Sequence, residues 1–272
     1  MNFAVIGIGK WGKNYLKSLK EINKASVISV CSKNRTTFEN LPEDFKSVEW
    51  FDDYKKAINE NIDTVIIATH PDSHFEIAKF ALENNKNVIC EKPCMFSEEQ
   101  YQIIQNLTKQ NNKIFFTNYI NLFHSICEEI RATIKNGKDW HWIDINNTGD
   151  GPIRKNYSDL WDYGSHIISV ILYILDCSDI AINNYAKDKD GNHVLCISYK
   201  DKRIYATFGN KSKERRNSIK LTTPDQSIEW IDKKNVNVLK IMLENFIDLK
   251  LNSNYNLSRD ISSILETLKI NE

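Results

Sequence analysis

Gly7-Ile8-Gly9-Lys10-Trp11-Gly12 directly follows the apolar stretch Phe3–Ile6 and opens a segment with helical periodicity at Trp11–Lys20. Glycines at these three places permit a tight turn, a close approach of the backbone to a pyrophosphate, and close packing of a helix on a strand. The anion would rest on the N-terminus of the helix. The motif alone also fits an accidental glycine turn, so its weight depends on the elements that follow it.

Alternating strand and helix patterns continue from this loop to about Asn118. Strands are predicted at Phe3–Ile6, Val27–Cys31, Val48–Phe51, Thr64–Ala68, Asn87–Cys90 and Lys113–Thr117, and helices at Trp11–Lys20, Asp53–Asn59, Ser73–Asn84 and Ser97–Gln110. Nearly continuous Val and Ile runs are typical of parallel strands that helices cover on both faces. We therefore predict an α/β domain over 1–118, a doubly wound parallel Rossmann sheet that binds a nicotinamide dinucleotide.

The pattern changes after Asn118. Helices are predicted at Leu122–Asn136 and Tyr163–Leu175, and strands at Trp140–Asn146, Ile182–Ala186, Val194–Tyr199, Arg203–Phe208 and Ser218–Thr222. Because strand follows strand, the pairing is expected to be mostly antiparallel. We predict a second, α+β domain over 119–272, built on a mostly antiparallel open sheet. The closing helices, at Val236–Leu251 and at Arg259–Lys269 after the cap Ser258, can pack back on the first domain.

The composition argues against several functional classes. The chain has 272 residues, 41% of them hydrophobic, which suits two folded domains. Lys plus Arg equals Asp plus Glu at 36 each, so no net field favours nucleic acid or an anionic membrane. The six cysteines lack the paired spacing of a zinc site, and no apolar run reaches the ~18 residues of a membrane span. The first residues run into a strand pattern without a targeting segment. We expect a cytoplasmic protein that binds a small molecule and no metal.

The turn after the second strand bears on the choice of cofactor. NAD-specific domains usually offer Asp or Glu about twenty residues beyond the glycine loop. This chain has Cys31-Ser32-Lys33-Asn34-Arg35 at that place. Lys33 or Arg35 can pair with a ribose 2′-phosphate, and Ser32 can donate a hydrogen bond to it, which favours NADP(H). The alternative is a solvated basic turn, which would leave NAD(H) possible.

Two further motifs follow strands of the first domain, and a third lies in the second domain. Ala68-Thr69-His70-Pro71-Asp72-Ser73-His74 follows the fourth strand, and Glu91-Lys92-Pro93 ends the fifth. Asp162 and His166 stand four residues apart at the start of a predicted helix, where both can lie on one face. In these motifs the sequence resembles the glucose–fructose oxidoreductase and inositol dehydrogenase family, Gfo/Idh/MocA, over nearly the whole chain.

The resemblance implies catalytic roles for Lys92, Asp162 and His166. Lys92 and His166 would contact the substrate hydroxyl or carbonyl beside the nicotinamide, with Asp162 next to them. Negative charge develops on oxygen when a carbonyl is reduced; a lysine ammonium stabilises that charge, and an imidazole exchanges the proton while a carboxylate orients the ring. The alternatives are a solvated lysine at a strand end and a buried, satisfied histidine.

The remaining candidates come from the same motifs. Cofactor binding is expected of Gly7, Gly9, Lys10, Trp11, Gly12, Ser32, Lys33, Arg35, Thr69, His70, Pro71, His74, Glu91, Lys92 and Asn118. Substrate binding is expected of Lys92, Tyr119, Arg154, Tyr157, Tyr163 and His166. After the sixth strand the family often places an Arg or a substrate-binding Tyr, and this chain keeps Tyr119 and lacks the Arg. Arg154 and Tyr157 lie in a polar loop that could equally be a connection.

His70 and His74 have helical spacing, but no third metal ligand is suggested. We expect His70 to line the nicotinamide side and His74 to pack at the start of its helix.

Taken together, these patterns predict an NADP(H)-dependent oxidoreductase that interconverts a hydroxyl and a ketone on a sugar-like substrate, with a nucleotide sugar as one candidate. One alternative is a polyol or inositol dehydrogenase that runs in the oxidative direction. The other is a sensor or scaffold that binds a dinucleotide without turnover. The family resemblance further implies a homodimer or homotetramer joined through the open face of the second sheet.

Overall fold

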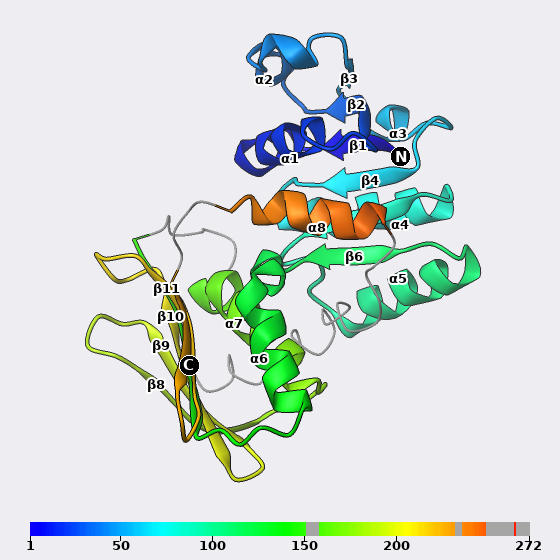
Figure 1. The fold of residues 1–272 in the computed structure, drawn as a ribbon. Coiled ribbons are helices and arrows are strands. Elements are labelled where there is room, and N and C mark those ends of the chain that lie inside the picture. Colours follow the sequence, from blue (N-terminus) through cyan, green and yellow to red (C-terminus); the bar gives the residue numbers. More distant parts are fainter. Residues whose placement is uncertain (151–157, 232–235, 249–263, 265–272) are drawn as a thin grey trace. The chain divides into compact units, whose positions relative to one another are not determined.

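The computed structural model describes residues 1–150, 158–231, 236–248 and 264. It divides into two compact units, which are described separately (Figure 1). Unit 1 contains Met1–Asn118 together with helix α8 (Val238–Ile247), and unit 2 contains the described residues from Tyr119 to Ile231. The polar loop with Arg154 and Tyr157, and the predicted closing helix Arg259–Lys269, lie outside the described residues.

Unit 1 is built on a six-stranded sheet in the order β3-β2-β1-β4-β5-β6, in which every pair is parallel. The strands are β1 (Asn2–Ile6), β2 (Ser26–Cys31), β3 (Glu49–Phe51), β4 (Thr64–Ile67), β5 (Asn87–Glu91) and β6 (Phe115–Asn118). The central strands are buried throughout, as expected for a sheet covered on both faces. The order reverses between β1 and β4, which is the place where ligands of such sheets bind.

Helices cover both faces of this sheet. They are α1 (Lys10–Lys20), α2 (Arg35–Glu39), α3 (Tyr54–Ala57), α4 (His74–Glu83), α5 (Glu98–Gln110) and α8. Residues of α4 and α5 share one core with alternate strand residues such as Ile67 and Val88. On the opposite face Phe116 of β6 lies against Phe246 of α8, and α8 packs on α1. Local caps set the helix starts, since the side chain of Ser97 accepts a hydrogen bond from the backbone of Gln100 at the start of α5.

Unit 2 is built on a second six-stranded sheet in the order β12-β11-β7-β10-β9-β8. The strands are β7 (Trp142–Thr148), β8 (Ala181–Lys187), β9 (His193–Tyr199), β10 (Lys202–Gly209), β11 (Arg216–Thr222) and β12 (Ser227–Ile231). All neighbours are antiparallel except β7 and β10, which are parallel. Alternate residues of β10 are buried and exposed, so one face of the sheet is covered and the other is open.

The covered face of the second sheet carries the helices α6 (Ser125–Lys135) and α7 (Ser165–Leu175), which pack against each other (Figure 1). Nearly every residue of α7 is buried, as its apolar sequence requires. Arg131 of α6 is buried as well, where its guanidinium pairs with Asp176 and lies 4.4 Å from the ring centre of Tyr173. The two predicted sheet classes, parallel in unit 1 and mostly antiparallel in unit 2, are both confirmed.

Candidate dinucleotide-binding and catalytic site

The glycine loop is shaped by contacts that only glycine allows. Gly7 has φ +91°, and a Cβ there would lie 2.7 Å from the backbone of Ala68 at the end of β4. A Cβ on Gly12 would lie 2.0 Å from the carbonyl oxygen of Gly7. Gly9 is different, because nothing lies within 4 Å of the Cβ position. Gly7 and Gly12 thus bring the turn, the helix and the neighbouring strand together, and Gly9 leaves space above the loop.

Helix α1 begins in that space. Gly9 is its N-cap and supplies no side-chain hydrogen bond, and no acidic residue lies in the first turn. The first backbone N–H groups of a helix have no partner within the helix, and the helix dipole adds positive potential at this end. The loop and the helix start therefore form a cradle that suits a pyrophosphate and that a side chain at position 9 would fill.

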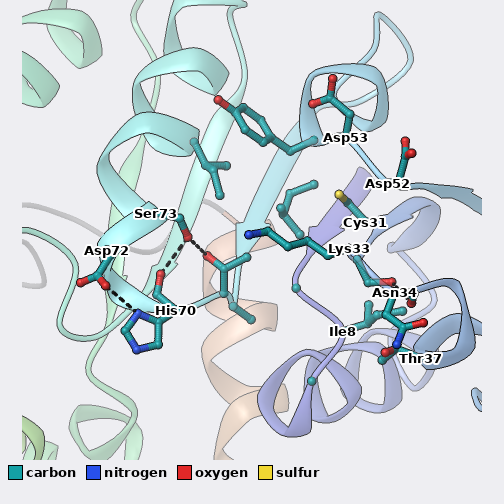
Figure 2. Close-up of a pocket in the computed structure, with 18 residues that line it drawn as sticks. Ile8, Cys31, Lys33, Asn34, Thr37, Asp52, Asp53, His70, Asp72 and Ser73 are labelled. Atoms are coloured by element: carbon teal, nitrogen blue, oxygen red, sulfur yellow. Dashed lines mark hydrogen bonds and ion pairs between the residues drawn. The ribbon is translucent and has the colours of Figure 1, made fainter. Parts of the chain in front are cut away.

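A pocket of about 1040 Å³ lies beside this cradle, entirely within unit 1 (Figure 2). Its lining residues come from the carboxyl ends of β1 to β4 and from the turns that follow. Among the predicted cofactor-binding residues, it is lined by Gly7, Gly9, Ser32, Lys33, Thr69 and His70. The lining does not include Lys10, Trp11, Gly12, Arg35, Pro71, His74, Glu91, Lys92 or Asn118.

The polar residues of the turn after β2 differ in what they contact. Lys33 extends into the pocket (Figure 2). Ser32 Oγ donates a hydrogen bond to the carbonyl oxygen of Asn34 and accepts one from Trp50 Nε1, at 2.9 and 3.0 Å, so this hydroxyl shapes the turn. Arg35 pairs with Glu39 at 3.2 Å and lies over the ring of Trp50. Of the two predicted cations, Lys33 is the one that faces the pocket.

Two carboxylates that sequence reasoning missed, Asp52 and Asp53, line the same pocket. They follow β3, which lies next to β2 in the parallel sheet, and that position could have indicated them. One oxygen of Asp53 accepts a hydrogen bond from the backbone of Lys55 and caps α3. Burial, together with these two carboxylates, raises the pKa of the Cys31 thiol to about 11.

The turn after β4 forms the opposite wall. His70 Nδ1 lies 3.2 Å from a carboxylate oxygen of Asp72, and both side chains are exposed. Ser73 Oγ donates to the carbonyl oxygen of His70 and is 2.8 Å from Thr69 Oγ1 (Figure 2). His74, by contrast, is fully buried. Its ring nitrogens face two backbone carbonyl oxygens, so it supports the turns of the site from behind.

A buried network lies under the end of β5. Tyr15 of α1 donates its hydroxyl to Glu91 Oε1 at 2.7 Å, and Asn118 Nδ2 donates to both the Tyr15 oxygen and Glu91 Oε1. Burial raises the pKa of Glu91, while the Tyr15 and Asn118 hydrogen bonds oppose that rise. Burial and the Glu91 carboxylate raise the pKa of Tyr15 well above its usual value. Glu91 directly precedes Lys92 in the chain, so the network holds the backbone next to Lys92.

The other predicted catalytic residues lie in unit 2. Asp162 and Tyr163 belong to a π-helical turn, Leu160–Gly164, and His166 follows in the first turn of α7. All three are half-buried. Asp162 and His166 therefore do not lie on one regular α-helix, because the helical pitch changes between them. Short π-helical turns of this kind are often found at functional sites. Tyr119, which was predicted to bind the substrate, is buried, with 2% of its surface exposed.

Comparisons with known proteins agree with this geometry. Residues 1–119 match the family described as "Oxidoreductase family, NAD-binding Rossmann fold", GFO_IDH_MocA. Glucose-6-phosphate 3-dehydrogenase of Bacillus subtilis is 25% identical over 236 residues, which are 76% of this chain and 64% of the relative. Myo-inositol 2-dehydrogenase of Thermotoga maritima is 23% identical over 138 residues, 50% of this chain and 41% of the relative. The matches thus span less than two thirds of the length of these relatives.

Solved structures share the fold over almost the full chain. A dehydrogenase of Clostridium difficile has a TM-score of 0.84 at 17% identity and covers 100% of this chain and 99% of its own. Myo-inositol 2-dehydrogenase of Lactobacillus plantarum has a TM-score of 0.82 at 13% identity, with coverage of 98% and 95%.

The fold and the glycine cradle define a Rossmann protein that binds a nicotinamide dinucleotide. Residues 1–119 are similar to the Rossmann domain of the Gfo/Idh/MocA family of oxidoreductases. Within the described residues, no cluster of three or more His, Cys, Asp or Glu side chains could hold a metal ion. None of the described helices has the length and apolar character needed to cross a membrane.

Proposed function

We propose that this protein is an NADP(H)-dependent oxidoreductase that interconverts a hydroxyl and a ketone on a sugar-like substrate. The observation that carries the proposal is the glycine cradle, which leaves room for a ligand at Gly9 beside the N-terminus of α1. Lys92 follows β5 at the carboxyl edge of the same sheet, where ligands of parallel sheets bind. Sugar and inositol dehydrogenases among the relatives support the substrate class, and nucleotide-linked sugars are the first substrates to test.

The residues present fit the cofactor. The cradle at Gly7, Gly9 and the start of α1 would hold the pyrophosphate, and Lys33 would face the adenosine ribose. When bound, the nicotinamide accepts or supplies the hydride. Half-buried Lys92 would stabilise negative charge on the substrate oxygen through its ammonium group.

Unit 2 is proposed to bind the substrate and to supply the proton. In the direction of reduction the His166 imidazolium gives a proton to the substrate oxygen, and in the direction of oxidation the neutral ring takes it back. Asp162 orients the ring or stabilises its charged form. Tyr163 stands between these two residues in the sequence and is half-buried, so it remains a candidate for a substrate contact.

Turnover of a sugar panel with NADPH, followed by the absorbance of the reduced cofactor, tests the reaction. Lys92→Ala and His166→Ala should each lower kcat by about a hundredfold or more while cofactor affinity stays nearly unchanged. Lys79→Ala is the matched control, because Lys79 is exposed and pairs with Glu83 on the outside of α4. Tight cofactor binding without turnover of any sugar would favour the sensor instead, and turnover of polyols alone would favour the inositol-type dehydrogenase.

The preference for NADP(H) rests on Lys33. Loss of its charge should weaken NADPH binding about tenfold, the effect of one charge-assisted hydrogen bond, and leave NADH binding unchanged. Arg35→Gln is the control for Lys33→Gln, because Arg35 pairs with Glu39 and does not line the pocket. Equal losses for NADPH and NADH, or no loss in Lys33→Gln, would contradict the preference.

We also propose that copies of the chain associate through the open face of the second sheet. Trp142 of β7 and Tyr205 of β10 are 41% and 45% exposed on adjacent strands. Large aromatic side chains are enriched in interfaces. Trp142→Lys should therefore lower the mass measured by light scattering, and an unchanged mass would exclude this face.

A further inference from the structure

His74 is the first residue of α4 and has no exposed surface. Its Nδ1 lies 2.9 Å from the carbonyl oxygen of Pro93, and its Nε2 lies 3.1 Å from the carbonyl oxygen of Thr69. Thr69 belongs to the turn after β4 and Pro93 to the turn after β5. A single buried ring therefore bridges two turns that meet at the carboxyl edge of the sheet.

The turn after β5 is the one that carries Lys92. On the N-terminal side of Lys92, the carboxylate of the adjacent residue Glu91 is held by Tyr15 and Asn118. On the C-terminal side, the Pro93 carbonyl faces His74. The backbone of Lys92 is thus held from both sides, and the side chain projects from a support that does not depend on solvent-exposed groups.

The chemistry of the ring limits how it can make this bridge. Both partners are carbonyl oxygens, which only accept hydrogen bonds, so a neutral imidazole can donate to one of them at a time. Burial lowers the pKa of His74, and the Thr69 and Pro93 carbonyls oppose that effect. The nearby charges act in opposite directions, because His70 lowers the pKa and Asp72 raises it. The shorter contact, to Pro93, is the better site for the one proton of the neutral ring.

We propose that His74 is a positioning residue for Lys92, and that it acts by donating its Nδ1–H to the carbonyl oxygen of Pro93. The role of Lys92 itself rests on the proposed function. Loss of the bond lets the turn shift, and a shift of about 1 Å in a catalytic group can lower turnover by about a hundredfold. Cofactor affinity is spared, because the pocket does not include His74.

A pair of amide substitutions separates the two contacts. His74→Asn places its amide nitrogen near the position of Nδ1 and keeps a donor for Pro93, whereas His74→Gln reaches the position of Nε2 and keeps a donor for Thr69. We expect His74→Gln to lower kcat about 10- to 100-fold with little change in the Kd for NADPH, and His74→Asn to retain most of the activity. Equal losses in the two variants, or a larger loss in His74→Asn, would overturn the proposal.

Two further measurements separate this proposal from the proposed function. In a Lys92→Ala background His74→Gln should cause no additional loss of kcat, and an additional loss would show that His74 acts elsewhere. If Lys92→Ala retains full turnover, it is the proposed role of Lys92 that fails. The ring can still be examined by ¹⁵N NMR of the wild-type protein, where a protonated Nδ1 is expected and a neutral ring protonated only at Nε2 would refute the bond to Pro93.

Discussion

Replacing Tyr15 by phenylalanine removes one oxygen atom from the network under β5 and leaves the shape of the core almost unchanged. The Tyr15 hydroxyl is completely buried and donates to Glu91 Oε1 at 2.7 Å. Asn118 can still donate to Glu91 at 2.9 Å. The variant therefore loses the charge-assisted hydrogen bond to Glu91, for which about 1.5–3 kcal/mol is expected when Glu91 is ionised. Asn118 also loses the Tyr15 oxygen as an acceptor but keeps Glu91.

The loss should depend on pH. Burial holds the folded pKa of Glu91 above its unfolded value, so the folded protein binds the proton more tightly, and stability falls as pH rises through the interval between the two values. Tyr15 opposes this shift, and its removal widens the interval. Near pH 4, where Glu91 is mostly protonated in both states, the bond lost between Tyr15 and Glu91 is a neutral one worth about 1 kcal/mol. At pH 8, where more of the Glu91 is ionised, the difference should approach about 1.5–3 kcal/mol.

Urea unfolding followed by circular dichroism at pH 4 and pH 8 measures both differences. Tyr54→Phe is the control, because Tyr54 is half-buried in the same unit and packs edge-on against Phe80; it should change the free energy of unfolding by no more than about 0.5 kcal/mol at either pH. A pH-independent loss in Tyr15→Phe would refute the reasoning, since it would mean that the hydroxyl does not stabilise a charged Glu91.

Three other predictions follow from the same structure. Gly12→Ala should destabilise the protein by about 3 kcal/mol, because its Cβ meets the Gly7 carbonyl. Gly9→Ala should lower stability by about 1 kcal/mol or less and should still weaken NADPH binding. Calorimetry of both variants checks this contrast. Arg131→Met should lower stability by about 1–2 kcal/mol, or a few degrees in Tm, through loss of the Asp176 ion pair and of the contact with the Tyr173 ring, and an unchanged Tm would contradict it. With a pKa of about 11, Cys31 should react with iodoacetamide at pH 8 on the order of a hundredfold more slowly than glutathione, as mass spectrometry can show.

Elements with a buried face could be predicted from the sequence, and elements without one could not. The apolar runs of β1, β4 and β5 predicted the Rossmann sheet because both faces of these strands are buried. Helix α2 was missed: it has five residues, none of them buried, and the Asn34 side chain starts it by accepting from the backbone of Thr36. Strand β12 was also missed, because it alternates between exposed and half-buried residues. The turn between Thr223 and Gln226 brings it beside β11.

The candidate site divides in a similar way. The position of Gly7, Gly9 and Lys33 at the pocket could be predicted, because all three follow the ends of strands of the parallel sheet. The hydrogen bond that Ser32 accepts from Trp50 could not be predicted, because Trp50 lies on a different strand. Asp52 and Asp53 enter the pocket for the same reason, through the pairing of β3 with β2. Contacts between neighbouring strands depend on the tertiary structure, and a local sequence pattern does not show them.

The folding of unit 1 depends on when helix α8 is synthesised. The chain leaves this unit at Asn118 and returns to it at Asn237, so the helix that packs on α1 emerges from the ribosome after every other described element of this unit. Its side chains Met242, Leu243 and Phe246 are almost fully buried, and together they represent roughly 5–9 kcal/mol of burial, as much as the whole stability of many domains. Synthesis of the intervening residues takes on the order of ten seconds. During that time the nascent Rossmann sheet carries an uncovered apolar face that a chaperone could shield.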